Sequence, residues 1–184
     1  GAEINIDGDT VTVNPEGFMK NTGTVLQCRE SGSTLRFFIP LALCLGKEIT
    51  FKGSQRLFQR PLDVYEDLCR SYGFKFEKKD CSLTVCGELE RGQYEVRGDI
   101  SSQFITGLIF SLVYLNEDSS IRVIPPFESR SYINLTIAAL KAFGVNIAFE
   151  DEFNIVIKKS CFQSFSGRVE GDYSNAAFLD VFNY

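Results

Sequence analysis

The chain has 184 residues, of which 44% are hydrophobic and 23% are charged, a globular composition that excludes an intrinsically disordered chain. The formal net charge is −5 and no run of Lys and Arg occurs, so we expect neither nucleic acid nor a membrane surface as a partner. Histidine is absent, which excludes histidine-ligated zinc sites, Ser-His-Asp triads and Cys-His dyads formed within this chain.

The six cysteines form no C-x-x-C pair, and several lie in apolar runs, which favours reduced thiols over disulfides. The longest apolar stretches, residues 37–46 and 104–115, are shorter than the roughly 18 residues that span a bilayer. The first nine residues lack the basic flank and apolar core of a signal peptide. We therefore expect a cytoplasmic protein.

In chain order, the first predicted elements are two short strands, one around Ile4 and one in TVTVNPEG (10–17). A helix follows in RESGSTLRFFIPLAL (29–43), with small polar residues at its start. Proline suits the first turn of a helix, so Pro61 is expected there and Arg60 at the start of that helix. This helix ends at Gly73, and two short strands come after it, the second in SLTVCG (82–87).

The second half of the chain repeats this order. In VRGDISSQF (96–104) a short strand passes through Gly98 to Ser101, Ser102 and Gln103, where a helix begins. Its continuation FITGLIFSLVYL (104–115) is apolar on all sides, which predicts a buried helix. A helix in 131–143, a strand after Gly144 and a strand in NIVIKK (154–159) follow, and EGDYSNAAFLDVF (170–182) predicts one further helix.

Three glycines mark an internal repeat. Gly1, Gly73 and Gly144 lie 72 and 71 residues apart, and each precedes alternation typical of a strand. The unit is about 70 residues long and reads β-α-β-α-β-β. Such a unit cannot cover its own sheet, so we expect an α/β fold with helices packed inward and sheets outside.

The repeat also predicts the organisation of the chain. One domain is expected over residues 1–171, with a partial unit at 1–25 that lacks its first strand-helix segment and complete units at roughly 26–97 and 98–170. Residues 172–184 are expected to begin the next unit, with the crossover to a second domain as the alternative. The chain is therefore interpreted as a fragment.

Each expected inner helix begins with small polar residues, such as Ser31 to Thr34 and Ser101 to Gln103. A helix start binds anions through free N–H groups, but serine is also a preferred cap that needs no ligand. Arg36, Arg56 and Arg60 shift this balance toward an anion site, although each is equally compatible with a solvated surface. For SRSY (129–132) the alternatives are a cap at Ser131 or a serine on phosphate beside a tyrosine ring.

Five blocks carry a resemblance to a known family: RESGSTLRF, QRLFQRPLDVYEDL, VRGDISSQFITGL, SRSYINLTIAALKAFGV and VEGDYSNAAF. In order and spacing, from Gly1 to Tyr184, they resemble the 5-enolpyruvylshikimate-3-phosphate synthases. The resemblance implies two domains of three such units, the inside-out α/β barrel of enolpyruvyl transferases. It also implies transfer of the enolpyruvyl group of phosphoenolpyruvate to the 5-hydroxyl of shikimate 3-phosphate, without cofactor or metal.

By the same resemblance, residues of this chain match substrate ligands. Those for shikimate 3-phosphate are Ser101, Ser102, Gln103, Ser129 and Tyr132, and those for phosphoenolpyruvate are Gly32, Arg60 and Gln103. Arg36 matches a supporting arginine near the cleft. Glu30 departs from the asparagine of many members, and we expect it to pair with Arg36.

The family's catalytic acid/base residues match nothing in this chain, so the fragment is expected to be inactive without its second domain. Two other readings remain: a non-catalytic module that binds small phosphoanions or serves in interactions, and the related transferase acting on UDP-N-acetylglucosamine. The Ser-Ser-Gln triplet and the Arg-Pro-Leu block favour the shikimate enzyme.

Overall fold

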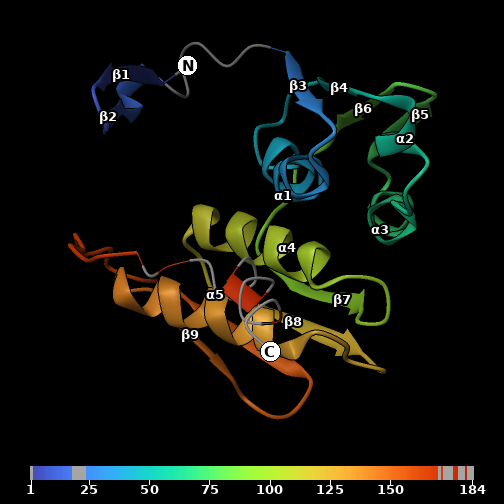
Figure 1. Cartoon of the computed structure of the whole chain (residues 1–184). Helices are drawn as coiled ribbons and strands as arrows, with labels where there is room; N and C mark the ends of the chain where they lie inside the picture. The colour runs from blue at the N-terminus through green and yellow to red at the C-terminus, as the bar shows by residue number, and fades with distance from the viewer. Residues whose placement is uncertain (1, 18–23, 170, 172–175, 178–180, 182–184) are drawn as a thin grey trace.

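The structure is a computed structural model that describes residues 2–17, 24–169, 171, 176–177 and 181. Two units of the order β-α-β-α-β-β follow one another, as the repeat predicts (Figure 1). The first contains β3 (Val25–Arg29), α1 (Gly32–Leu43), β4 (Ile49–Gly53), the single turn α2 (Gln55–Phe58), α3 (Asp63–Tyr72), β5 (Lys75–Lys79) and β6 (Ser82–Cys86). The second contains β7 (Gln93–Arg97), α4 (Ser102–Leu115), β8 (Ser119–Ile124), α5 (Arg130–Ala142), β9 (Asn146–Phe149) and β10 (Asn154–Lys158).

The sheets confirm the repeat. Their strand orders, β3-β4-β6-β5 and β7-β8-β10-β9, are equivalent position by position. In each, the first two strands are parallel, while the others pair antiparallel. Strand β7 lies in the second sheet, so the units divide between residues 86 and 93. We expected this division between residues 97 and 98, because we placed the boundary at Gly98 and not before the strand that precedes it.

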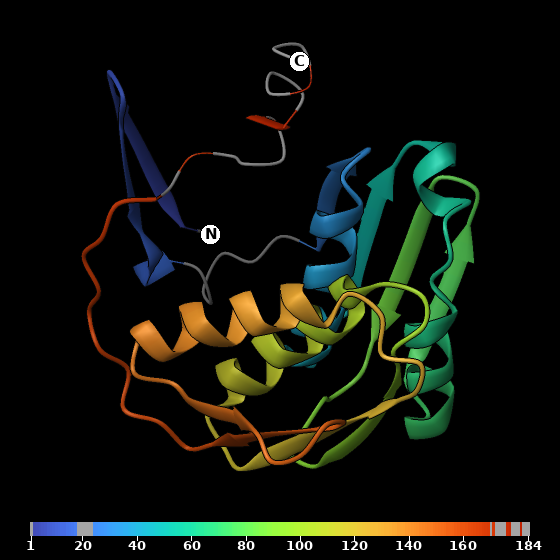
Figure 2. The same cartoon turned by 60° about the horizontal axis from the view of Figure 1, so that its bottom comes forward.

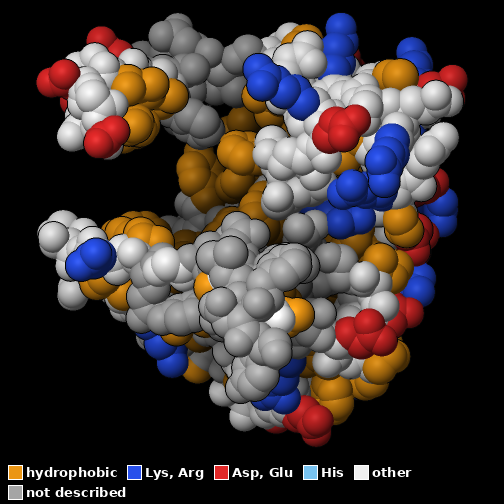
Figure 3. All heavy atoms as spheres, in the orientation of Figure 1, with side chains coloured by type: hydrophobic (Ala, Val, Ile, Leu, Met, Phe, Trp, Pro, Cys, Tyr) orange, Lys and Arg blue, Asp and Glu red, His pale blue; other side chains and the backbone are white. Residues whose placement is uncertain are grey.

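The partial unit appears as a hairpin of β1 (Glu3–Asp7) and β2 (Thr10–Asn14), followed by the short 3-10 turn η1 (Pro15–Gly17). Ile4 pairs with Val13 and Ile6 with Val11, which places four apolar side chains on one face. All four are more than half exposed, and Figure 3 shows hydrophobic side chains gathered on the hairpin. The expectation for Gly1 lies outside the described residues, as do Ser174 and Asn175 near the start of the helix predicted in 170–182 and most of the unit predicted at 172–184.

Two helices lie inside with the sheets outside them, whereas α5 (Arg130–Ala142) buries Ile133 and Ile137 and leaves most of its residues exposed. In Figures 1 and 2, α1 and α4 lie against each other between the two sheets. Helix α4 is the most buried helix of the described chain, as its apolar sequence predicts, with Phe104, Ile105, Leu108, Ile109 and Leu112 fully buried. The close contact needs Gly107: a Cβ there would lie 2.5 Å from the Arg36 carbonyl oxygen of α1. No described helix is both long and apolar enough to cross a membrane.

The helix ends follow the glycines, but the predicted start of α3 was wrong, and so was one of the two alternatives for the start of α5. Gly73 and Gly144 have φ values of 69° and 80°, the left-handed conformation that favours glycine. Helix α3 begins at Asp63 rather than at Pro61, because the Leu62 side chain is buried in the core and Leu62 becomes the cap. Helix α5 begins at Arg130, so the cap is Ser129 rather than Ser131.

Candidate functional site

A cavity of about 600 Å³ opens where the starts of α4 and α5 meet α1 and the loop before α3. The cavity is lined by seven of the eight residues that we proposed from the sequence as ligands or support, and by four residues that we did not propose. The lining residues are Arg36, Phe37, Arg60, Ser101, Ser102, Gln103, Thr106, Ser129, Tyr132, Leu135 and Thr136. The eighth residue, Gly32, lies directly against this set.

One end of the cavity is cationic. A Cβ on Gly32 would lie 2.9 Å from Nη1 of Arg60 and 3.7 Å from Nη1 of Arg36, so the two guanidinium groups converge over the bare backbone at the start of α1. Neither forms an ion pair with a described carboxylate. Two uncompensated arginines beside a helix N-terminus favour an anion of the size of a carboxylate or phosphate.

Arg36 joins the two units at this end. Its Nη1 donates to Oε1 of Gln103 at 2.7 Å, and its Nη2 donates to the Pro61 carbonyl oxygen at 3.4 Å. The guanidinium also lies over the Phe104 ring, 4.9 Å from the centroid. Burial lowers the pKa of Arg36, and the neighbouring Arg60 charge lowers it further. A bound anion would relieve this repulsion.

The expected ion pair between Glu30 and Arg36 is absent from the described residues. Arg36 lies one turn into α1 and reaches across to α4, where Gln103 accepts its hydrogen bond. Glu30 is exposed ahead of α1. Proximity in sequence suggested the pair, whereas the packing of α1 on α4 brings Arg36 to Gln103 instead.

The other end of the cavity is lined by hydroxyl groups. Ser101 caps α4, and its Oγ accepts the backbone N–H of Gln103 at 3.3 Å. Ser102, nearly buried, and Ser129 make no side-chain hydrogen bond to a described residue. Ser129 has a φ of 55°, a left-handed conformation that costs energy in serine and is often found at functional sites.

The serines therefore divide between the two alternatives that the sequence left open. Ser31 is a cap, because its Oγ accepts from Thr34 N at 3.1 Å. Ser101 is a cap whose O–H can still donate to a ligand. Ser102 and Ser129 have uncommitted hydroxyls at the cavity, and Tyr132 is 61% exposed beside them. Ser131 is not the cap of its helix.

Sequence reasoning missed Phe37, Thr106, Leu135 and Thr136. Thr106 lies one helical turn after Ser102, and Thr136 lies one turn after Tyr132, so i+4 spacing from the proposed residues could have found them. Their hydroxyls are 3.4 Å apart, and Thr136 Oγ1 donates to the Tyr132 carbonyl at 3.0 Å. Among the described residues no group of three or more acidic or thiol side chains is placed to hold a metal ion.

Comparisons with known proteins point to one family. A family model described as EPSP synthase (3-phosphoshikimate 1-carboxyvinyltransferase) matches residues 1–183. A 3-phosphoshikimate 1-carboxyvinyltransferase of Clostridium kluyveri is 45% identical over 156 residues, which cover 83% of this chain and 37% of that protein. One of Clostridium perfringens, strain ATCC 13124, is 38% identical over 182 residues, or 97% of this chain and 43% of that protein.

Among solved structures, an EPSP synthase from Acinetobacter baumannii superposes with a TM-score of 0.74 and 20% sequence identity. The match covers 98% of this chain and 41% of that one. At this identity the likeness shows the fold, which the chain shares with that EPSP synthase over nearly its whole length. The chain spans about two fifths of the length of the curated relatives that it matches.

Proposed function

Because the chain belongs to the EPSP synthase family, we propose that its cavity binds phosphoenolpyruvate and shikimate 3-phosphate for transfer of the enolpyruvyl group to the 5-hydroxyl of the latter. One observation carries the proposal. Residues from four separate segments, proposed from the sequence as ligands or as support, line a single cavity with two uncompensated arginines at one end and free hydroxyls at the other. Each end can bind one anionic group, the first through charge and the second through hydrogen bonds.

We assign the cationic end to phosphoenolpyruvate. Arg60 offers a planar, bidentate pair of donors to its carboxylate or phosphate, and Gly32 leaves room for the anion to approach the start of α1. Because Oε1 of Gln103 already accepts from Arg36, the amide N–H₂ of Gln103 is directed to donate to ligand. Arg36 thus supports the site by orienting Gln103.

We assign the hydroxyl end to shikimate 3-phosphate. Ser101, Ser102 and Ser129 can each donate one O–H to the phosphate oxygens, and the starts of α4 and α5 add free backbone N–H groups. The exposed Tyr132 ring gives the carbocycle an apolar surface. Gln103 lies between the two ends and contacts both substrates in this arrangement.

The proposed reaction adds the 5-hydroxyl to C2 of phosphoenolpyruvate while a proton goes to its methylene carbon. The tetrahedral intermediate then loses inorganic phosphate from C2 and a proton from the methyl group, and this elimination restores the double bond. Both steps need a general acid/base and further cations to neutralise the substrate charges. The described cavity offers groups that bind the two substrates. We propose that a second domain supplies the general acid/base. This chain alone is therefore expected to turn over no substrate.

We also place the protein in the cytoplasm, as expected for a reduced, cysteine-containing enzyme. All six cysteines are free thiols, including the exposed Cys81 and Cys161. A reducing compartment keeps such exposed thiols unpaired.

The test uses a chimera in which this chain replaces the matching segment of the Clostridium kluyveri relative. The chimera is expected to release phosphate from phosphoenolpyruvate only when shikimate 3-phosphate is present. Arg60→Ala removes a charge-assisted, bidentate contact worth about 1.5–3 kcal/mol per hydrogen bond. The value of kcat/KM should therefore fall by about tenfold to hundredfold. The measurement is steady-state phosphate release with each substrate varied in turn.

Arg56→Ala is the matched control, because Arg56 lies four residues earlier on α2 and does not line the cavity. It should retain kcat/KM within about twofold, the spread expected for a surface change of under 0.5 kcal/mol. A chimera that is active with near-normal kcat/KM after Arg60→Ala would contradict the assignment of the cationic end. A well-folded chimera without turnover would contradict the function itself.

A further inference from the structure

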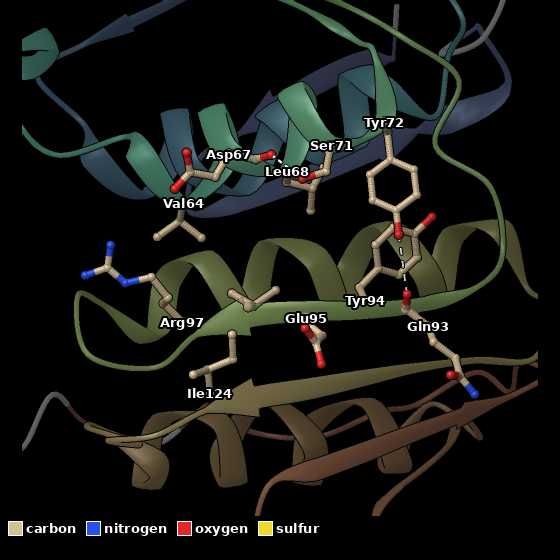
Figure 4. A pocket seen from close by; sticks show the side chains of 11 residues that line it. Val64, Asp67, Leu68, Ser71, Tyr72, Gln93, Tyr94, Glu95, Arg97 and Ile124 are labelled. Carbon is tan, nitrogen blue, oxygen red and sulfur yellow. Dashed lines mark hydrogen bonds between the residues drawn. The ribbon is translucent and has the colours of Figure 1, made fainter.

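An open groove of about 500 Å³ separates the two units on the side of α3 and β7 (Figure 4). Its walls carry Val64, Leu68 and Tyr72 from α3 and Tyr94 and Val96 from β7. The side chains of α3 therefore do not close fully on the second unit. At one end of the groove the Tyr72 and Tyr94 rings are in contact, 5.4 Å between centroids, so packing joins α3 to β7 there, while the rest of the groove stays open.

Among the described residues, two hydrogen bonds cross this groove, one at each end. At the far end, Tyr72 Oη donates to the Gln93 carbonyl oxygen at 3.4 Å, drawn in Figure 4 as the dashed line between Tyr72 and Gln93. At the end next to the cavity, Arg97 Nη1 donates to Asp63 Oδ2 at 3.2 Å. The first is long and weak, whereas the second joins opposite charges.

Arg97 also binds the segment that leads into α4. Its Nε donates to Asp99 Oδ1 at 3.2 Å and its Nη2 to Asp99 Oδ2 at 2.8 Å, a bidentate pair. Asp63 opens α3 three residues after Arg60, and Asp99 lies two residues before Ser101. The guanidinium thus ties the loop that carries Arg60 to the turn that carries the serines.

The same contacts exclude Arg97 as a substrate ligand in this arrangement. Its Nε and both terminal nitrogens face carboxylates, whereas Arg36 and Arg60 have no described carboxylate partner. The hydrogen bonds to Asp99 raise the pKa of Arg97, and the same contact lowers the pKa of Asp99. The three residues carry a net charge of −1, so they add no attraction for an anion.

We propose that Arg97 is a positioning residue: by joining Asp63 to Asp99 across the groove, it sets the spacing between Arg60 and the Ser101–Gln103 turn. This inference rests on the proposed function for its consequence in catalysis, but the contact itself can be tested without substrate. Exposed ion pairs add little to global stability, so the effect is expected at the site and not in Tm. Misplacing one anion ligand weakens binding of the substrate that it holds.

The first test needs no substrate. Amide chemical shifts of the 184-residue chain are compared among the unchanged chain, Arg97→Ala and Arg70→Ala. Arg70 is the matched control, since it lies on α3, the helix that begins with Asp63, and pairs with Glu66 and Asp67 at the surface, away from the cavity. We expect Arg97→Ala to shift the amides of Arg60 and of Ser101–Gln103, and Arg70→Ala to leave them unchanged. Unmoved Arg60 and Ser101 amides in a folded Arg97→Ala chain would overturn the proposal.

The second test measures kinetics in the chimera. Arg97→Ala should raise the KM for phosphoenolpyruvate about tenfold with kcat changed less than threefold, because Arg60 holds this substrate in the ground state and transition state alike. Asp63→Asn should raise the same KM, and the double variant should be no worse than Arg97→Ala, because both act through one contact. Arg97→Lys should rescue only in part, since an ammonium cannot bridge both carboxylates.

The outcomes separate the two proposals. A chimera without turnover contradicts the proposed function, and the amide shifts still decide whether Arg97 positions the site. An active chimera in which Arg97→Ala and Arg70→Ala have equal KM and kcat contradicts the role of Arg97 and leaves the function standing. Equal losses of Tm and kcat, with KM unchanged, would assign Arg97 a purely structural role and also overturn the proposal.

Discussion

Serines at helix starts in this protein have two different roles. The Oγ atoms of Ser31 and Ser54 accept backbone N–H groups of Thr34 and Leu57, which stabilises their helices and leaves ligand binding to others. Ser129 instead adopts a left-handed conformation and makes no cap bond. Whether a serine at a helix start can bind phosphate therefore depends on whether its hydroxyl is already used in a cap hydrogen bond, and not on the residue type alone.

Residue environment also controls thiol chemistry. Burial raises the pKa of Cys69 to about 12, and the nearby Glu66 charge adds to this. Burial raises the pKa of Cys44 to about 12 as well, although the hydrogen bond with Ser111 acts in the opposite direction. The thiolate is the reactive form, so these two thiols are protected at moderately alkaline pH.

We predict that iodoacetamide at pH 8.5 labels the exposed Cys81 and Cys161 and spares Cys44 and Cys69. A thiol in the unfolded chain titrates near pH 8.5, below the raised folded values. As the pH rises, the Cys44 and Cys69 thiols therefore lose their protons in the unfolded state before they do so in the folded state. The free energy of unfolding is highest below about pH 8.5 and declines as the pH rises toward 12. Peptide mass spectrometry after timed labelling, with urea unfolding at pH 7.5 and pH 10, provides the measurement. Equal labelling of buried and exposed thiols in the folded chain would contradict it.

At the scale of elements, a proline in α1 is compensated by a tyrosine from α3. Pro40 lies inside α1 and has no N–H, so the Arg36 carbonyl four residues earlier lacks its helical donor. The fully buried Tyr65 hydroxyl lies 2.8 Å from that carbonyl oxygen and 2.8 Å from the Phe104 carbonyl oxygen of α4. One hydroxyl thus joins three helices directly behind the cavity.

Tyr65→Phe should destabilise the protein by about 1–3 kcal/mol, because it leaves a buried carbonyl without a donor. The phenyl ring would retain its edge contact with Phe104, 5.0 Å between centroids, so the loss reports the hydroxyl. Urea unfolding gives the free energy.

Pro40→Ala supplies the missing N–H and provides the control. Tyr65→Phe should therefore cost less in the Pro40→Ala background than in the unchanged chain. The same cost in both backgrounds would show that the hydroxyl does not serve the Arg36 carbonyl.

At the scale of the molecule, stability is expected to be uneven. Helix α4 is buried between the two sheets, whereas every residue of β1 and β2 is exposed. Amides of residues 105–113 should exchange slowest with deuterated solvent and those of β1 and β2 fastest, because local opening of the hairpin exposes little apolar surface. Hydrogen exchange followed by NMR measures this, and equal protection of the two regions would contradict the prediction.

The arrangement of units also explains the composition of the site. The first unit contributes Gly32, Arg36 and Arg60, and the second contributes the Ser101–Gln103 turn, Ser129 and Tyr132. Neither unit has both the cations and the free hydroxyls. The cavity exists only where the two units meet, with Arg36 and Arg97 as bridges between them.

Much of the fold could be predicted from local pattern. Glycine spacing gave the period, and Gly73 and Gly144 adopt the left-handed conformation expected of helix ends. Helix starts were less predictable: α3 begins at Asp63 because Leu62 is drawn into a core that local sequence does not describe. The expected Glu30–Arg36 pair failed for the same kind of reason.

The sequence by itself determined the repeating unit, the buried character of α4 and, through the resemblance, the residues that we propose as ligands. Only the tertiary structure decided which of their atoms are free and which are held by others. Arg36 and Gln103 are 67 residues apart, and Arg97 and Asp63 are 34 apart. These contacts depend on how α1, α3 and α4 pack around Gly107, and the geometry of packing between units is not encoded in the pattern of any one segment.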